Sequence, residues 1–503
     1  MKKIIAGLLA VFLVAVTAGC DFIPTDRPPV DPLDAEHEGI YVLETKTVEN
    51  IEVTAQYVYS IIELKKDGKV ETRTLDMYGL DAASGNYKIN GDTITITIGL
   101  RTQNYDYDED EETLSYEGRI SRKDTKMTYK KSSSFSAPTT KGGVNFKDEL
   151  FGDPIDQNFY NYCPTIFMEG NDIMHIYYCS NKIDGNITDY IAYRKGILQG
   201  DGTWKFSEKS LVLEPTPREP GDPQVWDSRH DCDPSVIKGE FKYKDENYNY
   251  LMAFLGCYSN DSSSNEVGIA VAKNPEGPWI KIVEMNPIAD YYNSPEYSKG
   301  AWGYGQPCLV SVDKKGKVLL FYTKGISSGT YAYVEYWDLA DLDNPNKIHE
   351  EKVSNSGVVN ASGGVDVINN GDFAYDPVNN RLFVIKEDFP YPSDNGSGDA
   401  VTGGNTTLYL DLNIDDEYVG ETLFAGGIMK WNAVGSISKN ETTFDRVHNA
   451  GIITDEYGWL INPFQIPVVY TRSDLAMRHP NWSKPGHWQA LHTYRLYGYL
   501  LEI

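Results

Sequence analysis

From about residue 147 to the end of the chain, one strand pattern recurs: an apolar strand, a Gly/Asn/Asp turn, and a second apolar and aromatic strand. The first strands of these units begin near Pro164, Pro234, Pro307, Phe373 and Ala450, so consecutive starts lie 66 to 77 residues apart. Self-similarity at a fixed period indicates a repeat architecture, and short strands with turn residues are typical of β-propeller blades. A β-sandwich is the rival fold, but it does not predict so even a repeat. We therefore expect an all-β chain in which residues 147–503 form a five-bladed β-propeller.

Composition agrees with an all-β chain and excludes one class of partner. The 503 residues include 36 Tyr and 9 Trp, and aromatic and β-branched residues, which favour strands, dominate the periodic stretches. The formal net charge is −27. Nucleic-acid binding needs a positive footprint, so we expect no nucleic-acid partner. The acidic excess by itself indicates only a soluble surface.

The N-terminus has the pattern of an export signal. Lys2 and Lys3 precede an apolar run over residues 4–16 that is too short to span a bilayer. The run ends in Thr17-Ala18-Gly19-Cys20, which resembles the bacterial lipobox. The resemblance implies a signal peptide over residues 1–19, lipidation of Cys20 and an extracytoplasmic protein anchored in the bacterial cell membrane. The alternative is ordinary cleavage with an unmodified cysteine. The proline-rich residues 20–36 are predicted to be a tether.

Residues 37–130 alternate strands with tight turns. An Asn-Gly pair at 90–91 between alternating strands is a strong hairpin signal. The pattern resembles the small lipocalin-like β-meander or barrel of many bacterial lipoproteins. The acidic run from Asp106 to Glu112 is predicted to lie on a loop, as a solvated segment or, alternatively, a calcium site. The Ser-, Thr- and Gly-rich residues 131–146 are predicted to be a flexible linker.

Five cysteines remain beyond Cys20, and their odd number means that they cannot all pair with one another. They are Cys163, Cys179, Cys232, Cys257 and Cys308. No C-x-x-C pattern occurs, which disfavours a zinc or redox motif. We expect buried thiols, and the spacing allows one disulfide.

Propeller sites lie at the axis, where the first strands of the blades begin. The start of the second unit reads Asp233-Pro234-Ser235-Val236, a Gly-Pro-Trp turn follows at 277–279, and His448-Asn449 opens the fifth unit. This arrangement resembles the five-bladed propeller glycosidases, the arabinanase and xylosidase family (glycoside hydrolase family 43) with its invertase and levanase relatives. The resemblance implies carbohydrate as the partner. It also implies a role for His448 in holding an axial metal ion, which we expect to be Ca²⁺.

The family uses three acids, and this chain matches one. Asp233 stands at the family's second-blade position, whereas Cys163 stands where the first-blade Asp belongs and Gly305-Gln306 where the third-blade Glu belongs. Glycoside hydrolysis needs one carboxyl group to protonate the leaving oxygen and a second to activate water or attack, and glutamine cannot donate a proton as an acid does. Asp372, at the start of the fourth inner strand, is the preferred catalytic partner of Asp233. We further expect Pro234 to bias Asp233 toward an extended conformation.

Other polar and aromatic residues lie near the predicted axis. The candidate substrate-binding residues are Trp226, His230, Trp302, Tyr304 and Gln306. Aromatic rings there suit stacking on a sugar, with core packing as the alternative. Further acids that could replace the missing ones are Asp227, Asp231, Glu387 and Asp388, for which closing a turn or facing solvent is the alternative.

Two hypotheses of function follow. The first is a cell-surface lipoprotein whose glycoside hydrolase-like propeller acts on plant or microbial polysaccharide. The second is a non-catalytic glycan-binding lipoprotein that has lost the family's acids. No G-x-S-x-G, H-E-x-x-H or P-loop pattern occurs, which disfavours an esterase, a zinc protease and an NTPase.

Overall fold

The computed structural model describes residues 37–151, 160–181, 188–218, 225–259, 263–388, 404–412, 430–444, 446–473 and 494–503. The predicted signal peptide, Cys20 and the tether lie outside these residues. The prediction of an all-β chain is confirmed, because the described elements are strands except for two 3₁₀ turns, η1 (Thr54–Gln56) and η2 (Lys66–Gly68), and the short helix α2 (Lys439–Thr442). In the described ranges no helix is long and apolar enough to cross a bilayer.

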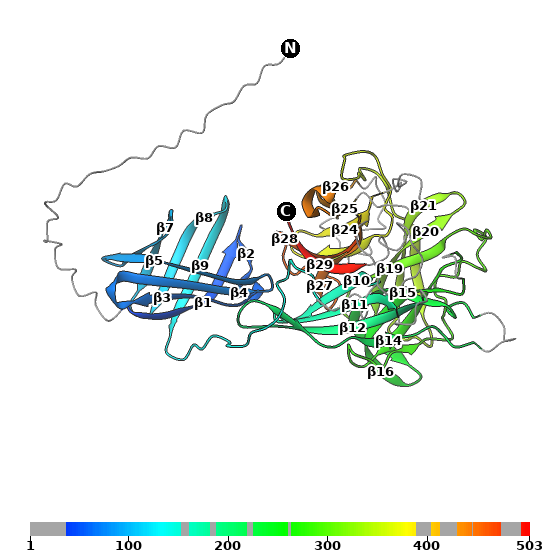
Figure 1. Cartoon of the computed structure of the whole chain (residues 1–503), viewed down its shortest axis with the longest axis horizontal. Coiled ribbons are helices and arrows are strands. Elements are labelled where there is room, and N and C mark those ends of the chain that lie inside the picture. Colours follow the sequence, from blue (N-terminus) through cyan, green and yellow to red (C-terminus); the bar gives the residue numbers. More distant parts are fainter. Residues whose placement is uncertain are drawn as a thin grey trace, which may run out of the picture.

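The N-terminal strands form a closed barrel at one end of the molecule (Figure 1). The strands are β1 (Gly39–Val48), β2 (Ile51–Glu52), β3 (Tyr57–Lys65), β4 (Lys69–Asp76), β5 (Gly79–Asn90), β6 (Thr93–Ile98), β7 (Arg101–Asp108), β8 (Thr113–Ile120) and β9 (Lys123–Ser132). Strands β3 to β9 pair antiparallel in chain order, and β1 pairs with both β3 and β9. Eight strands therefore close the barrel, and β2 pairs along β1. Alternate side chains, among them Tyr41, Ile94 and Leu114, fill its core.

The remaining strands form five antiparallel groups. The first strand group is β10 (Tyr162–Glu169), β11 (Ile173–Asn181), β12 (Asp189–Leu198), β13 (Trp204–Phe206) and β14 (Ser210–Leu213). The second is β15 (His230–Tyr243), β16 (Glu246–Cys257), β17 (Glu266–Ala272) and β18 (Ile280–Lys281). The third is β19 (Gly303–Ser311), β20 (Lys317–Ile326), β21 (Gly329–Asp338) and β22 (Asn346–Lys352). The fourth is β23 (Asp372–Asp376), β24 (Arg381–Glu387), β25 (Gly404–Asp411) and β26 (Asn432–Ser438), and the fifth is β27 (Arg446–Asp455), β28 (Gln465–Ser473) and β29 (Arg495–Glu502).

Each strand group packs on the next through a hydrophobic cluster. One cluster joins the first and second groups, a second joins the second and third, and further clusters join the third to the fourth and the fourth to the fifth. The fifth group returns to the first, because β27 pairs in parallel with β10 and a further cluster contains Ile166 and Ile453. First strands β10, β15, β19, β23 and β27 therefore contact one another in sequence around a closed path.

The barrel packs on the first and fifth groups through a shared core. Tyr59 and Met77 of the barrel belong to the same buried cluster as Trp204, whose indole Nε1 donates to the Met77 carbonyl at 2.8 Å. Residues of the predicted linker take part in this contact: Val144 pairs with Trp204, and Phe146 is buried. The side chain of Asn171 also donates to the Tyr57 carbonyl at 2.7 Å. Hydrophobic burial and hydrogen bonds thus join the barrel to the strand groups.

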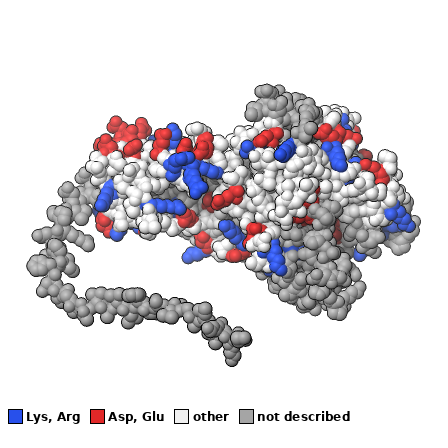
Figure 2. All heavy atoms as spheres, turned by 90° about the horizontal axis from the view of Figure 1, so that it is seen from above, with Lys and Arg blue, Asp and Glu red and all other residues white. Residues whose placement is uncertain are grey.

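The acidic run from Asp106 to Glu112 spans the end of β7 and the turn before β8, so it lies partly on a strand. Every acidic side chain in the run is exposed. Lys130 and Lys131 of β9 pair with Glu111 and Glu112. Figure 2 shows acidic side chains gathered on the barrel, with basic side chains beside them. These contacts match the prediction of a solvated acidic segment.

Candidate functional site

One residue in or just before the first strand of each strand group has a left-handed backbone. These residues are Cys163, Asp233, Gln306, Asn370 and Asn449, with φ between 34° and 51°. All five line one small axial cavity of about 40 Å³. Non-glycine residues rarely adopt positive φ, and such strain, on the order of 1–3 kcal/mol each, clusters at functional sites. Because this strained turn recurs at every strand group, the axis is the strongest candidate for a functional site.

In four of the five groups a β-bulge in the first strand explains the turn. The pairing register shifts between Tyr162 and Thr165 in β10 and between Cys232 and Ser235 in β15, and equivalent shifts occur in β19 and β27. A bulge inserts one unpaired residue and re-aims its side chain. The expectation that Pro234 would hold Asp233 extended is wrong, because Asp233 has a φ of 46°. The bulge at the axis overrides the local preference imposed by proline.

A second, larger cavity of about 280 Å³ lies beside the small axial cavity, and Asp233 lines both cavities. Its polar and aromatic lining includes Asp189, Asp233, His230, His448, Arg446, Gln306, Tyr162 and Trp302. We call this cavity the axial pocket. Its volume is close to the lower end of small-molecule sites, about 300–1,000 Å³. Carboxylates, imidazoles, a guanidinium and two aromatic rings thus line one hollow at the centre of the ring.

Asp233 is buried among sulfur atoms. Its Oδ1 lies 3.0 Å from Cys232 Sγ and 3.4 Å from Cys179 Sγ, and these two cysteines form a disulfide that joins β11 to β15. The disulfide that the sequence allows is therefore present, and Cys163, Cys257 and Cys308 are buried thiols. Cys163 shares a side-chain hydrogen bond with Asp233. The Cys163 thiol therefore contacts the Asp233 carboxyl group directly.

Burial makes the Asp233 carboxyl group a weaker acid than an exposed aspartate. Desolvation of the carboxylate raises the pKa of Asp233 to about 7, and the negative charges of Asp189 and Glu387 add to the increase. The hydrogen bond from Cys163 opposes it. A carboxyl group with a pKa near the operating pH can hold a proton and release it, which general acid catalysis requires.

Asp189 supplies a second carboxyl group to the axial pocket. Its Oδ2 lies 2.9 Å from His230 Nδ1, and both residues line the cavity. Because the charge of Asp189 acts on Asp233, one pocket holds two carboxyl groups in electrostatic contact. His230 Nδ1 also accepts a hydrogen bond from the Asp189 backbone N–H at 3.1 Å, so the predicted residue His230 contributes by positioning Asp189.

Glu387 is buried behind the pocket and organises its wall. Its carboxylate pairs with Nδ1 of His448 and accepts hydrogen bonds from the Asn449 backbone N–H at 2.9 Å and the Asn370 side chain at 2.6 Å. The alternative that Glu387 faces solvent is wrong, because its exposure is 0%. Glu387 thereby ties the turns of the fourth and fifth groups together.

The surroundings of His448 fit a calcium ion poorly. Its ring stacks near Tyr162 and Tyr494, and Glu387 engages its Nδ1. Burial and the neighbouring charge of Arg446 lower the pKa of His448, although Glu387 opposes this. Calcium takes six to eight oxygen ligands, whereas the Glu387 oxygens beside the ring already have protein partners. We therefore assign no step of chemistry to an ion here.

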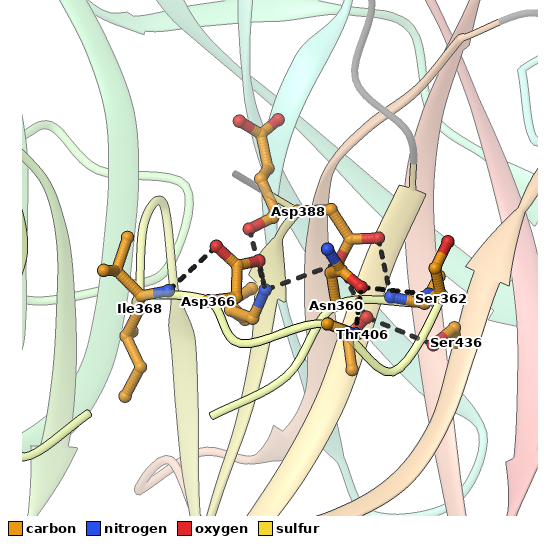
Figure 3. A network of polar contacts seen from close by, with 12 residues as sticks. Asn360, Ser362, Asp366, Ile368, Asp388, Thr406 and Ser436 are labelled. Carbon is orange, nitrogen blue, oxygen red and sulfur yellow. Dashed lines mark hydrogen bonds and ion pairs between the residues drawn. The ribbon is translucent and has the colours of Figure 1, made fainter. Parts of the chain in front are cut away.

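A second buried ionic network supports the fourth group (Figure 3). The Lys386 ammonium is fully buried, pairs with Asp366 and lies 3.3 Å from Asp388 Oδ1. Asp388 also accepts a hydrogen bond from Thr406 Oγ1 at 2.7 Å and one from the Ala361 backbone at 3.0 Å. The alternative that Asp388 faces solvent is therefore wrong, and its contacts are structural. A buried charge needs such partners to offset its desolvation.

The predicted aromatic residues divide between the pocket and the core. Trp302 lines the axial pocket. Trp226 instead packs on Phe254, with ring centroids 5.5 Å apart, and its ring covers Gly256, where a Cβ would meet it at 2.1 Å. Tyr304 is buried and bonds to Glu296, away from the axial pocket. Core packing, the alternative to stacking, thus describes Trp226 and Tyr304.

The predicted partner Asp372 lines the small axial cavity but not the larger axial pocket. Its Oδ2 accepts a hydrogen bond from the Ile452 backbone at 2.6 Å, and burial raises its pKa to about 6. Asp227 and Asp231 lie 2.6 Å and 2.7 Å from the Lys281 ammonium, outside the axial pocket. The structure thus brings Asp233 together with Asp189, His230, Gln306 and Trp302 in the axial pocket, and places Asp372 beside Asp233 in the small cavity.

Some buried polar atoms around the axis have no hydrogen-bond partner within the described part of the chain. They include Gln306 Oε1, Asn449 Oδ1 and Asp189 Oδ1. An unpaired buried acceptor costs about 1–3 kcal/mol, so native proteins satisfy such atoms with water or ligand. All three residues line the axial pocket. The pocket therefore presents acceptors suited to the hydroxyl donors of a polar ligand.

Neither a protein-family model nor a curated protein matches the sequence. Solved structures that match include an α-L-arabinofuranosidase from Podospora anserina in complex with cellotriose, with a TM-score of 0.40, 13% identity, and 73% of this chain and 98% of the other covered. A family 117 glycoside hydrolase from the marine bacterium Zobellia galactanivorans has a TM-score of 0.40, 13% identity, and coverage of 72% and 87%. A family 43 enzyme from Xanthomonas citri has a TM-score of 0.37, 12% identity, and coverage of 69% and 90%. These structural neighbours are glycoside hydrolases. At 12–13% identity they indicate the fold only, so the chemistry of this chain depends on the residues of its own pocket.

Proposed function

We propose that this chain is a carbohydrate-active protein whose axial pocket binds and hydrolyses a glycoside. The observation that carries the proposal is the pair of carboxyl groups in that pocket, Asp189 and Asp233, with the pKa of Asp233 raised to about 7. Glycoside hydrolysis needs one carboxylic acid to protonate the leaving oxygen and one carboxylate to activate water or attack the sugar. Asp233 is the proton donor in this proposal, and Asp189, held by His230, is the carboxylate.

The pocket lining supports a sugar as the ligand. The Trp302 ring offers an apolar face for stacking on a sugar ring, and the unpaired oxygens of Gln306 and Asn449 accept hydrogen bonds from hydroxyl groups. Arg446 adds a cationic donor. We propose plant or microbial polysaccharide as the source of the glycoside.

A specific observation favours a second candidate, glycan binding without turnover. Cys163 and Gln306 occupy the positions where the family resemblance expects two of three acids, and Cys163 contacts Asp233. A thiol and an amide bind hydroxyl groups but supply neither a proton donor of suitable pKa nor a carboxylate. The two candidates differ in whether Asp189 replaces a missing acid.

The proposed function also includes a domain architecture and a location at the cell surface. The closed path of five strand groups, each packed on the next, supports a five-bladed propeller. The eight-stranded closed barrel supports a lipocalin-like N-terminal domain. Lys2, Lys3 and Cys20 support export and lipid anchoring at the bacterial cell surface.

The test is a screen of the purified protein for binding and turnover against aryl-glycosides and oligosaccharides, with Asp233→Asn, Asp189→Asn and Asp372→Asn compared. In an enzyme, Asp233→Asn and Asp189→Asn should each reduce turnover by about 10²–10⁴-fold, the usual contribution of an acid or base. The matched control Asp372→Asn should retain turnover, because its carboxylate binds the Ile452 backbone. In a binding protein, Asp233→Asn should weaken affinity by about 1–3 kcal/mol only. If Asp233→Asn changes neither turnover nor glycan binding, the axial pocket is not the functional site.

A further inference from the structure

The Asp233 carboxylate is surrounded by sulfur atoms that the proposed carbohydrate chemistry does not use. One ligand atom each from Cys163, Cys179 and Asp233 lies within 4.8 Å of the others, and all three residues are buried. They make up the one group of three such ligands in the described residues. Cys232 Sγ, 3.0 Å from Asp233 Oδ1, adds a third sulfur. The cluster therefore contains three sulfur atoms and a carboxylate.

The disulfide between Cys179 and Cys232 decides whether the cluster can bind an ion. Disulfide sulfur is not a thiolate, and the thiolate is the ligand that metals take. A dithiol reductant transfers two electrons and two protons to the disulfide, which yields two cysteine thiols and the oxidised dithiol. The reduced cluster then offers Cys163, Cys179 and Cys232 together with Asp233. We propose that, in this reduced form, it binds one thiophilic divalent cation such as Zn²⁺.

The geometry suits a tetrahedral ion. Bonds of about 2.3 Å to sulfur and about 2.0–2.2 Å to oxygen place tetrahedral ligands about 3.5–4 Å apart. Asp233 Oδ1 lies 3.4 Å from Cys179 Sγ and 3.0 Å from Cys232 Sγ, and reduction frees the two bonded sulfur atoms to separate to the spacing that an ion requires. The ligands come from β10, β11 and β15, which belong to two packed strand groups, so their backbones are already positioned. Cys163 and Asp233 also line the small axial cavity, which gives an ion a route to them. Metal binding releases the three thiol protons to solvent.

Thiolate ligands determine the class of ion. Cysteine thiolates select zinc and other soft ions, whereas calcium and magnesium take oxygen ligands. An ion bound here would engage the carboxylate of Asp233. The proposed ion site needs the three sulfur atoms and Asp233, and it does not require that the axial pocket bind carbohydrate.

The test uses Co²⁺ as a spectroscopic probe of the full protein after reduction with a dithiol and its removal under argon. Reduced wild type should bind one Co²⁺ per chain and show thiolate-to-cobalt charge-transfer absorption with the visible bands of tetrahedral Co²⁺. Cys163→Ser should lose most of this absorption, and the unreduced wild type should show none. The matched control Cys308→Ser removes another buried thiol, on β19 and outside the cluster, and should keep the full signal.

A second measurement covers the case in which Cys163→Ser fails to fold. Stoichiometric Zn²⁺ should protect the thiols of Cys163, Cys179 and Cys232 in the reduced wild type from alkylation, while Cys308 is unaffected by the ion. Peptide mass spectrometry identifies the protected positions. The proposal is overturned by reduced wild type without cobalt bands, by equal bands in folded Cys163→Ser, or by alkylation that Zn²⁺ does not change. Neither measurement uses a glycan, so its outcome does not depend on whether the protein binds or hydrolyses carbohydrate.

Discussion

His230 Nδ1 lies 2.9 Å from Asp189 Oδ2, so the first strand of the second group holds an acid from the third strand of the first. The two residues line the axial pocket beside Asp233. This contact across the boundary between groups places a second carboxyl group at the pocket.

Removing the partner of Asp189 should misplace that carboxylate. If Asp189 acts on substrate, His230→Gln should lower kcat by about 10²-fold, the cost of a small misplacement of a reacting group, with a smaller effect on KM. Steady-state kinetics measures the effects on kcat and on KM separately. The exposed His349, changed to Gln, is the control and should leave kcat unchanged. A loss of folded protein with normal kcat in the remainder would show that His230 is only structural.

The raised pKa of Asp233 predicts a pH-dependent contribution to stability. Its pKa is about 7 in the folded protein and about 3.9 in an unfolded chain, so between these values the folded state binds more protons. Stability from this group therefore decreases as the pH rises from about 4 to about 7. Asp233→Asn removes the titration, and its free energy of unfolding relative to wild type should increase from pH 4 to pH 8. Urea unfolding at both values measures this, and an equal difference at both would contradict it.

Two tryptophans near the axis should respond differently to truncation. Trp302→Ala should weaken glycan binding, because the ring lines the axial pocket. It should cost less stability than Trp226→Ala, although the Trp302 ring also packs on Gly305 and Gly325. Trp226→Ala should instead cost about 3–5 kcal/mol of stability, because its ring packs on Phe254 and Gly256. Calorimetric titration and thermal unfolding separate the two effects. The reverse pattern would mean that Trp226 contacts ligand.

The family resemblance and the structure make different predictions about calcium. The donors around His448 lead us to expect that EDTA leaves the melting temperature unchanged in both wild type and His448→Ala. A bound ion would stabilise the folded state by mass action, so its removal would lower the melting temperature of the wild type more than that of the variant. Elemental analysis of the purified protein is the independent check, and stoichiometric calcium would support the axial ion that the sequence resemblance implies.

The proposed lipid anchor depends on one residue, Cys20. Cys20→Ala should abolish incorporation of a labelled fatty acid and release the protein from the membrane fraction, because stable anchoring needs acyl chains. Metabolic labelling in a bacterial host measures this. Label that persists on Cys20→Ala, or that is absent from wild type, would rule out this anchor.

The all-β class was predictable from the sequence because strands carry a local signal. Alternating apolar and aromatic residues, separated by turn residues such as Asn90-Gly91, indicate strands without knowledge of the fold. The even spacing of the strand starts also predicted that Asp233 lies at the beginning of a first strand, where the structure has it lining the axial pocket. A residue's place in a repeat is a property of the chain alone.

The partners of Asp233 were decided by the tertiary structure. Asp189 opens a third strand and Glu387 closes a second one, and neither position has a motif that marks it as axial. The position of Asp372 at the start of the fourth inner strand made it the predicted partner instead, and its carboxylate binds the Ile452 backbone. The left-handed turn of Asp233 comes from the bulge between β15 and β16, whereas its raised pKa and the sulfur atoms around it arise where separate strand groups meet. Electrostatic and packing interactions act through space, so they depend on how the groups close around the axis, while the sequence determines only which side chains each strand brings there.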